Sequence, residues 1–374
     1  MNSYKFYPHN VQNFQYEYKK LSYIAFLRML HDNHSDIVTN PDLLREDYIP
    51  SNIPARESQI NELLFCISPL SDRNKPIASW VFGPPGTGKT ATCKFLLRKL
   101  DNESNIRGLY INCWENNTFF AVLDKIVREL RILGAERLHT SFKLERLKKY
   151  FEKRSLVLVL DEIDMPNKRE RNDILYNFSM IARLQIICIS NNKYVLFGLD
   201  DRIKSRLNPK QLEFLPYSED DLMFILKQRA EFALSPTSYD NKSLRLMASL
   251  AEGDARVATQ ILRTAAYLAD KQGCDRINEI HVKLGYFSVK NMKRIYMLSK
   301  LTVHHRLLFE ILQEQGPLKS GDFWRAYIQK CQQLKVKHIA ERTYNLYIKK
   351  LADMGLIRAK RALIRGQVRE YSVA

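Results

Sequence analysis

The 374-residue sequence contains no run of about 18 uncharged apolar residues, the length that a membrane-spanning helix needs. Its first twenty residues, MNSYKFYPHNVQNFQYEYKK, contain no apolar core of the kind that a secretory signal has. These absences exclude a membrane-spanning or exported protein from the interpretation. We expect a soluble, intracellular, cytoplasmic protein with no membrane partner.

Cysteine is scarce, and no metal-binding spacing is found. The six cysteines form no C-x-x-C pair, and none lies near a histidine at the spacing of zinc ligands. We expect them to be small buried apolar residues in a reducing compartment. The sequence also has no internal repeat and no low-complexity segment.

Acidic residues are sparse toward the C-terminal end. Residues 291–374 contain 17 Lys and Arg against six Asp and Glu, a net charge of +11, within a formal net charge of +18 for the chain. A local excess of this kind indicates a polyanionic partner, nucleic acid first and an anionic membrane surface second. A basic face that serves only solubility is the alternative.

Hydrophobic patterning divides the chain into segments. Residues 1–40 show no clear period. From 41 to 215, helical stretches separate four short apolar runs, at 77–83, 107–113, 155–162 and 184–190. This alternation predicts an α/β domain with a buried parallel sheet. Residues 216–288 show only helical periodicity, and the first of their helices is expected to begin at Ser218, which an acidic turn follows.

Residues 289–374 predict a winged helix-turn-helix. Two amphipathic helices, at 300–316 and 319–334, precede a third at about 338–354, and a β-prone hairpin with Gly366 near its turn follows. We expect the third helix to enter the major groove of DNA. Its predicted outward residues are Glu341, Arg342, Asn345 and Lys349, and its predicted core residues are Leu346, Ile348 and Leu351.

Several residues of this predicted domain suit contacts with DNA. Arg342 and Asn345 are the candidates for base edges, because Arg can bridge guanine and Asn can bridge adenine. Tyr344 is expected to stack on a base or touch a phosphate. The wing supplies further candidates for backbone contacts: Arg358, Lys360, Arg361, Arg365 and Arg369. For each wing charge, a solvated surface residue is an equal alternative.

The stretch GPPGTGKT at 83–90 follows a predicted strand and opens a predicted helix, which is the context of a phosphate-binding loop. Its backbone amides and the helix N-terminus favour phosphate. We expect Lys89 to reach the β- and γ-phosphates and Thr90 to bind Mg²⁺. The candidate loop residues are Pro85, Gly86, Thr87, Gly88, Lys89, Thr90 and Ala91.

Two later strands end in polar residues that suit ATP hydrolysis. LVLVLDEID delivers Asp161, a candidate for holding Mg²⁺ through water, and Glu162, a candidate for polarising the attacking water. The next strand ends in CISNN, where Asn191 is expected to reach the γ-phosphate and that water. An ordinary turn role for Asn191 is the alternative.

In their order along the chain, Lys89, the Asp161–Glu162 pair, Asn191 and EGDAR at 252–256 resemble the AAA+ ATPases. The resemblance implies a nucleotide-binding base at 41–215, a helical lid at 216–288 and ATP or ADP with Mg²⁺ as ligands. It also implies that Arg256, on a lid helix, contacts the γ-phosphate. A plain surface charge is the alternative for Arg256.

Within the AAA+ ATPases, three stretches resemble the archaeal and eukaryotic replication initiators, the origin-recognition and helicase-loader ATPases. They are DYIPSNIPARESQINELL (47–64), DILYNF (173–178) and LDDRIKSRLNPKQLEFLPYSEDDLMFILKQRAE (199–231). The resemblance covers roughly residues 45–374. It implies an adenine site lined by Arg56 and the nearby Ile49, with Tyr48, Tyr217 and Arg229 as further nucleotide-binding candidates.

The same resemblance implies residues that act on a neighbour or on DNA. Arg206 matches the position of an arginine finger, and Arg202 competes with it, unless one of the two pairs with Asp200 or Asp201. Lys168, Arg169 and Arg171 lie in MPNKRERN (165–172), a short, charged form of the family's extra segment, and are expected to hold phosphates. This polar form argues against wedging into the minor groove.

The resemblance therefore implies a nucleoid-associated, ATP-dependent replication initiator. It would bind double-stranded origin DNA and help recruit the replicative helicase, with other initiator subunits as further partners. Slow, Mg²⁺-dependent hydrolysis of ATP would act as a switch. Two other classes remain open at this point: a signalling ATPase of the STAND type, and an AAA+ transcriptional regulator that binds DNA without an origin function.

Overall fold

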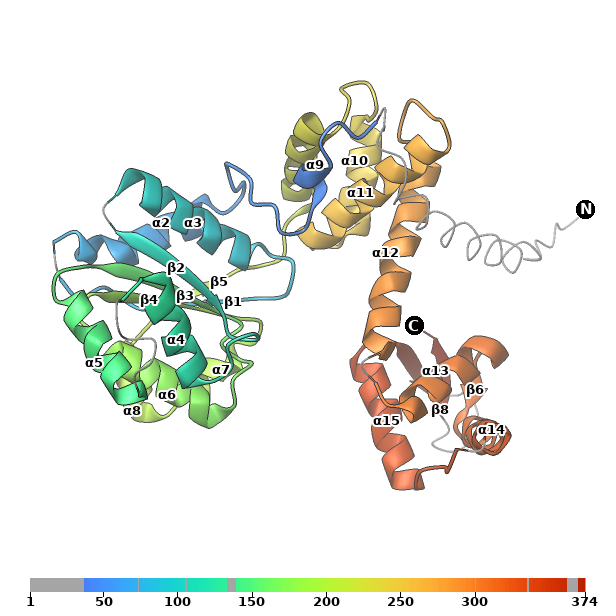
Figure 1. Ribbon diagram of the computed structural model, residues 1–374. Helices are drawn as coiled ribbons and strands as arrows, with labels where there is room; N and C mark the ends of the chain where they lie inside the picture. Colours follow the sequence, from blue (N-terminus) through green and yellow to red (C-terminus); the bar gives the residue numbers. More distant parts are fainter. Residues whose placement is uncertain are drawn as a thin grey trace, which may run out of the picture. The chain divides into compact units, whose positions relative to one another are not determined.

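A computed structural model describes residues 37–72, 74–104, 106–132, 139–299, 301–334, 336–361 and 369–373 (Figure 1). The chain divides into two units, Met1–Gly285 and Tyr286–Ala374, and the boundary falls within one long helix, α12 (Glu279–Ser299). Within the described residues, no helix has both the length and the apolar character needed to cross a membrane.

The first unit is built on a parallel sheet of five strands in the order β2-β3-β4-β1-β5. Its strands are β1 (Ser79–Phe82), β2 (Arg107–Asn112), β3 (Leu156–Asp161), β4 (Leu184–Ser190) and β5 (Lys210–Glu213). In this order β4 lies between β1 and β3. The segments that follow β1, β3 and β4 therefore meet beyond the carboxyl ends of the strands, where ligands of open parallel sheets bind.

Helices cover both faces of the sheet, as the alternating pattern predicts (Figure 1). In β3, the buried side chains of Leu156, Leu158 and Leu160 pack into one core, and those of Val157 and Val159 pack into the other. The helices of the first core are α4 (Phe119–Glu129), α5 (Thr140–Phe151), α6 (Lys168–Ser179), α7 (Tyr194–Phe197) and α8 (Asp201–Leu207). Those of the second are α2 (Glu57–Ile67), the 3₁₀-helix η2 (Ser68–Leu70) and α3 (Lys89–Glu103).

Two of these elements carry no clear apolar pattern. In β5, KQLE, only Leu212 is buried, because the strand pairs with β1 alone at the edge of the sheet. In α5, Lys143 lies on the inner side, where its ammonium forms a 2.5 Å ion pair with Asp124 of α4. A buried lysine breaks the apolar stripe by which a helix is read from sequence.

The lid follows β5 and consists of α9 (Glu219–Ala233), α10 (Asn241–Leu250), α11 (Ala255–Lys271) and the start of α12. The predicted helix start at Ser218 is confirmed. The Ser218 hydroxyl accepts a hydrogen bond from the Asp221 amide, and the Asp221 carboxylate accepts one from the Ser218 amide. This capping box fixes where the lid begins.

The segment before α2 packs on the lid, although the sequence pattern assigns residues 41 onward to the base. It includes the 3₁₀-helix η1 (Pro41–Leu44), the blue stretch beside α9 and α11 in Figure 1. Val38 forms a β-bridge with Leu234, and the Thr39 amide donates a 2.9 Å hydrogen bond to the Ala233 carbonyl. Residues 37–48 thus form part of the lid's surface.

The second unit has the three helices and hairpin of a winged helix-turn-helix. Its elements are α13 (Val303–Gln315), β6 (Leu318–Lys319), α14 (Ser320–Gln333), α15 (Glu341–Asp353), β7 (Ile357–Arg361) and β8 (Arg369–Val373). The strands form an antiparallel sheet in the order β6-β8-β7, and β6 is an addition to the predicted elements. Gly366 and Arg365, between β7 and β8, lie outside the described residues.

Candidate functional site

The loop between β1 and α3 has the backbone of a phosphate cradle. Gly86 and Gly88 have φ values of +78° and +87°, which side chains other than glycine rarely adopt. A Cβ atom at Gly86 would lie 1.9 Å from the Asp254 carboxylate, and one at Gly88 would lie 2.3 Å from the Tyr217 hydroxyl. Both glycines therefore serve close approach of the lid as well as the turn itself.

Lys89 opens α3 inside this loop and is 6% exposed. Its ammonium donates hydrogen bonds to the carbonyls of Gly83 and Pro84, at 2.8 and 2.7 Å. Burial lowers the pKa of Lys89 to about 8, and the carboxylate of Asp161 opposes that shift. A buried cation beside the loop amides gives this end of the site its affinity for anions.

The carboxylate of Asp161 receives hydrogen bonds at both oxygens. Oδ2 accepts from the Thr90 hydroxyl at 2.7 Å and from the Tyr110 hydroxyl at 2.8 Å, and Oδ1 accepts from the Glu162 amide at 2.9 Å. Sequence reasoning missed Tyr110. It lies on β2, and only the pairing of β2 with β3 brings it to Asp161.

Glu162 is half-buried beside Asp161 and has a positive φ of 54°. Burial raises the pKa of its carboxyl, the carboxylates of Asp161 and Asp164 raise it further, and Arg256 opposes them. A raised pKa suits a carboxylate that takes a proton from water. The positive φ marks backbone strain of the kind that collects at active sites.

Two asparagines follow β4, and the structure separates their roles. The side-chain oxygen of Asn192 accepts the Tyr194 amide at 2.9 Å, and its carbonyl accepts the Ser190 hydroxyl at 3.0 Å. Asn192 is therefore the turn residue that leads into α7. Asn191 lines a cavity together with Glu162. The local contacts thus favour Asn191 over its neighbour as the residue that faces a ligand.

That cavity has a volume of about 250 Å³ and runs from the phosphate loop to the lid. Arg256 lines it from the first turn of α11, where Asp254 caps the helix through the amides of Arg256 and Val257. The Ala255 amide donates a 3.0 Å hydrogen bond to the Gly86 carbonyl. The lid helix therefore begins directly on the phosphate loop.

The structure brings most of the predicted nucleotide-binding residues to the walls of this cavity. They are Tyr48, Ile49, Pro85, Gly86, Gly88, Lys89, Thr90, Ala91, Asp161, Glu162, Asn191, Tyr217, Arg229 and Arg256. Thr87 lies behind the loop, with its hydroxyl bonded to the Pro84 carbonyl at 2.9 Å. Lys94, Ile225 and Gln228 also line the cavity and carry no signal by which the sequence could single them out.

Arg56 does not line the cavity, so the expectation that it contacts the adenine base is corrected. It is 6% exposed and donates hydrogen bonds to the carbonyls of Thr87, at 3.1 Å, and Leu215, at 2.7 Å. Its guanidinium lies 3.9 Å from the centre of the Tyr217 ring. Arg56 therefore ties the back of the phosphate loop to the start of the lid.

Arg202 and Arg206 are both exposed on α8. The neighbouring carboxylates have lysine partners: Asp201 pairs with Lys204 at 2.9 Å, and Asp200 pairs with Lys168 at 3.7 Å. The sequence left open that Arg202 or Arg206 pairs with one of these carboxylates. In the structure both carboxylates pair with lysines instead. Which of the two arginines acts on a neighbour stays a prediction.

Comparisons with known proteins match this arrangement. Residues 77–201 match the model of the AAA domain, and residues 223–286 match that of the Cdc6 AAA+ ATPase-type lid domain. The chain is 33% identical to ORC1-type DNA replication protein 1 of Sulfolobus acidocaldarius over 362 residues, which is 90% of each chain. The chain belongs to the family of ORC1-type DNA replication proteins.

A second relative and a solved structure agree with this assignment. The ORC1-type DNA replication protein of Thermococcus kodakarensis is 32% identical over 351 residues, or 87% of this chain and 84% of that protein. The structure of the Aeropyrum pernix ORC1 protein in complex with DNA is similar with a TM-score of 0.73, at 27% identity, over 91% of this chain and 94% of that one. This ORC1-type chain is an AAA+ ATPase with a role in the initiation of DNA replication.

The segment of this ORC1-type protein at 165–172 is the first turn of α6 and the residues before it. Asn167 caps the helix by accepting the Glu170 amide at 3.0 Å, and Lys168 and Arg169 are exposed. Arg171 instead turns inward. It is half-buried and donates to the Asp164 carbonyl at 3.5 Å, and burial lowers its pKa. The expected phosphate contact of Arg171 is therefore corrected.

On α15, Arg342, Asn345 and Lys349 are exposed, as predicted from helical spacing. Tyr344 is 3% exposed and packs its ring 4.6 Å from that of Trp324, so the expected contact of Tyr344 with DNA is wrong. Leu346 was expected in the core and is instead 59% exposed, whereas the predicted core residues Ile348 and Leu351 are buried.

The hairpin presents its charges outward where the structure describes them. Lys360 and Arg369 are exposed on β7 and β8, and Lys360 pairs in register with Glu370. Arg361 ends β7 and pairs in register with Arg369. The wing thus presents two described basic side chains near its tip.

Proposed function

We propose that this chain is an ATP-controlled initiator that binds double-stranded origin DNA and helps recruit the replicative helicase together with other initiator subunits. One observation carries the proposal: a nucleotide cavity closed by a lid and a winged helix with an exposed polar face lie in the same chain. The ORC1 protein of Aeropyrum pernix, whose structure was solved in complex with DNA, is the relative from which DNA binding is inferred. Nucleoid association would follow from origin binding.

In this proposal the loop amides and Lys89 bind the phosphates of ATP. The hydroxyl of Thr90 and the carboxylate of Asp161 suit Mg²⁺, because both are hard oxygen donors, only 2.7 Å apart, and phosphate oxygens supply further ligands. Mg²⁺ held there would offset the charge that develops on the β- and γ-phosphates. Glu162 takes a proton from the attacking water, which Asn191 orients.

Two arginines complete the proposed ATPase site. Arg256 reaches the γ-phosphate from the lid, so the state of the nucleotide affects how the lid docks. Arg206 or Arg202 enters the site of a neighbouring subunit. Hydrolysis by an isolated chain is then slow, because an arginine finger contributes about 10³- to 10⁵-fold to kcat in nucleotide hydrolases that use one.

Most of the proposed DNA contacts follow from the exposure of the side chains, and that of Arg361 follows from its place in the sequence alone. Arg342 and Asn345 read base edges in the major groove. The backbone contacts come from Lys349, Lys168, Arg169, Lys360, Arg361 and Arg369, which neutralise phosphates and make binding depend on salt. Neither alternative function is favoured, because the Cdc6-type lid and the ORC1-type relatives place the chain among replication proteins.

DNA footprinting tests this function. Wild type, Lys89→Ala and an Arg342→Ala, Asn345→Ala double variant are compared on genomic fragments, at two salt concentrations, with ATP or ADP. We expect discrete protection at repeated sites near a replication start, lost in the double variant and altered by nucleotide only when Lys89 is present. Protection confined to promoters would instead favour a transcriptional regulator. Uniform binding that salt abolishes would leave only an electrostatic anchor.

A further inference from the structure

One wall of the cavity is made by a segment of the chain that contacts both the lid and the AAA+ base. Residues 37–48 lie on the lid, where Ile37, Val38 and Leu44 are buried. From Ile49 onward the chain is bonded to the base, because Arg98 of α3 donates a 3.1 Å hydrogen bond to the Ile49 carbonyl. The chain thus passes from lid to base between Tyr48 and Ile49, and both residues line the cavity.

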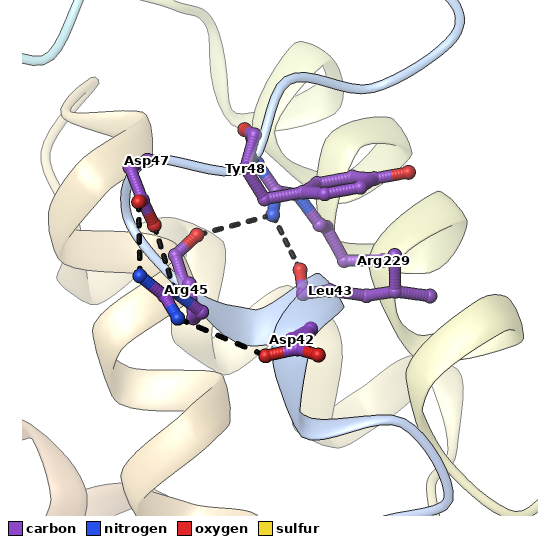
Figure 2. A network of polar contacts seen from close by, with 6 residues as sticks. All are labelled: Asp42, Leu43, Arg45, Asp47, Tyr48 and Arg229. Atoms are coloured by element: carbon purple, nitrogen blue, oxygen red, sulfur yellow. Dashed lines mark hydrogen bonds and ion pairs between the residues drawn. The ribbon is translucent and has the colours of Figure 1, made fainter.

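Arg229 of α9 holds the lid end of this segment (Figure 2). Its guanidinium donates hydrogen bonds to three backbone carbonyls, those of Leu43, Arg45 and Tyr48. It also lies 4.7 Å from the centre of the Tyr48 ring. No carboxylate is among its partners in the described part of the chain. A guanidinium satisfied by carbonyls alone fixes backbone position, because its donors form a rigid planar fork.

The ion pairs of Arg45 within the segment are weaker anchors. Arg45 pairs with Asp47 at 3.0 Å and with Asp42 at 3.8 Å (Figure 2). All three side chains are more than half exposed. Exposed pairs of this kind contribute little to stability. Burial lowers the pKa of Arg229, which reflects the removal of its charge from water. The half-buried Arg229, together with the side chain of Gln260 on α11, which donates a hydrogen bond to Glu46, therefore fastens the turn to the lid.

We propose that Arg229 is a positioning residue for the base of the bound nucleotide: through the Tyr48 carbonyl it fixes the Tyr48–Ile49 wall to the lid. Arg98 binds the next carbonyl, that of Ile49, to the AAA+ base. The Tyr48–Ile49 peptide therefore keeps its place over the cavity only while the lid is docked on the AAA+ base. The affinity that the adenine base adds then depends on the lid, whereas the phosphate loop binds phosphates independently of Arg229. This inference rests on the ATP site proposed above.

The test separates the contribution of the adenine base to affinity from that of the phosphates. Isothermal titration calorimetry measures the binding of ADP and of tripolyphosphate, which has neither base nor sugar, to the full chain. Arg229→Met should raise the Kd for ADP about tenfold, a loss of about 1.4 kcal/mol, and leave the Kd for tripolyphosphate unchanged. Arg229→Lys should fall between, because one ammonium cannot reproduce a planar fork.

Arg245→Met is the matched control, since Arg245 lies on lid helix α10, is 62% exposed and pairs only weakly with Glu219 and Asp220. It should match wild type for both ligands. Arg98→Met is a second variant, placed in the AAA+ base, for the case that Arg229→Met does not fold. It is also expected to weaken the binding of ADP and to leave that of tripolyphosphate unchanged.

Three results would overturn the proposal. They are parallel loss of ADP and tripolyphosphate binding, unchanged ADP binding in both the Arg229 and Arg98 variants, and a wild type that binds the two ligands equally. Failure of the wild type to bind either ligand is a different outcome, because it would remove the ATP site itself.

Discussion

Single hydrogen bonds set the geometry around the proposed metal ligand. The hydroxyls of Tyr110 and Thr90 share one acceptor, Oδ2 of Asp161. Burial raises the pKa of Tyr110, so its phenol remains a donor. Groups that orient a metal ligand typically change metal affinity or activity 10- to 100-fold, so we expect Tyr110→Phe to raise the Mg²⁺ concentration for half-maximal ATP hydrolysis about tenfold.

The measurement is a titration of Mg²⁺ at saturating ATP. Tyr150→Phe is the matched control, because it removes a hydroxyl from α5 in the same domain, outside the cavity. ADP binding in the presence of a chelator should be the same in both variants and in wild type. An unchanged Mg²⁺ dependence in Tyr110→Phe would show that this hydrogen bond does not serve the metal.

What could be predicted at single residues depended on how local the signal was. The loop at 83–90 and the Asp161–Glu162 pair are contiguous and follow buried strands, so sequence alone located them. The partners of Arg229 lie 181 to 186 positions away along the chain, and no local pattern encodes such a distance. The sequence predicted that Arg56 contacts the adenine base, but its side chain lies behind the phosphate loop, against the ring of Tyr217. Tyr217 is distant in the sequence, so no local pattern could predict this direction.

At the scale of an element, two adjacent residues of α15 have different roles: Tyr344 stabilises the core of the winged helix, and Asn345 is a candidate for recognising DNA. The Tyr344 hydroxyl is buried and has no hydrogen-bond partner among the described residues, whereas Asn345 is exposed. A buried hydroxyl without a partner costs about 1–3 kcal/mol, so Tyr344→Phe should keep or raise the free energy of unfolding. Tyr344→Ala should lower it by about 3–5 kcal/mol, because the ring fills the core.

Asn345→Ala should do the opposite: leave stability unchanged and weaken specific DNA binding by about 1–3 kcal/mol. Chemical unfolding and fluorescence anisotropy with a footprinted site measure the two quantities for each variant. Loss of DNA affinity in Tyr344→Phe would mean that this phenol contacts DNA despite its burial.

Elements with a strong period could be predicted, and those shaped by their neighbours could not. The strands at 156–161 and 184–190 are buried throughout, so their apolar runs are unambiguous. β5 buries only Leu212 and α5 turns Lys143 inward, and neither shows a clean stripe. Leu346 follows the core residue Tyr344 by two positions, and that spacing points it away from the core.

At the scale of the whole molecule, the cavity holds every proposed hydrolytic group except the arginine finger. Lys89, Glu162 and Arg256 meet in one cavity, whereas Arg202 and Arg206 lie exposed on α8 outside it. Neither arginine pairs with a carboxylate among the described residues, and Arg206 lies 5.9 Å from the centre of the Tyr176 ring, so either side chain can enter another subunit's site. ATP hydrolysis by the wild type should therefore rise more than linearly with protein concentration.

Mixing two inactive variants identifies the finger. Glu162→Gln keeps the arginines but cannot activate water, and Arg206→Ala keeps the carboxylate but offers no finger. Arg206→Ala alone should hydrolyse ATP at the slow basal rate of an isolated chain, and Glu162→Gln alone should be slower still. In an equal mixture, random association makes about a quarter of the interfaces join an intact Glu162 to an intact Arg206, and activity should recover in proportion.

The same mixture with Arg202→Ala in place of Arg206→Ala decides between the two arginines. Recovery with Arg206→Ala, and full activity of Arg202→Ala alone, assigns the finger to Arg206. The reverse pattern assigns it to Arg202. No recovery in either mixture, with activity independent of protein concentration, would mean that each chain hydrolyses ATP with its own residues and that α8 serves another contact.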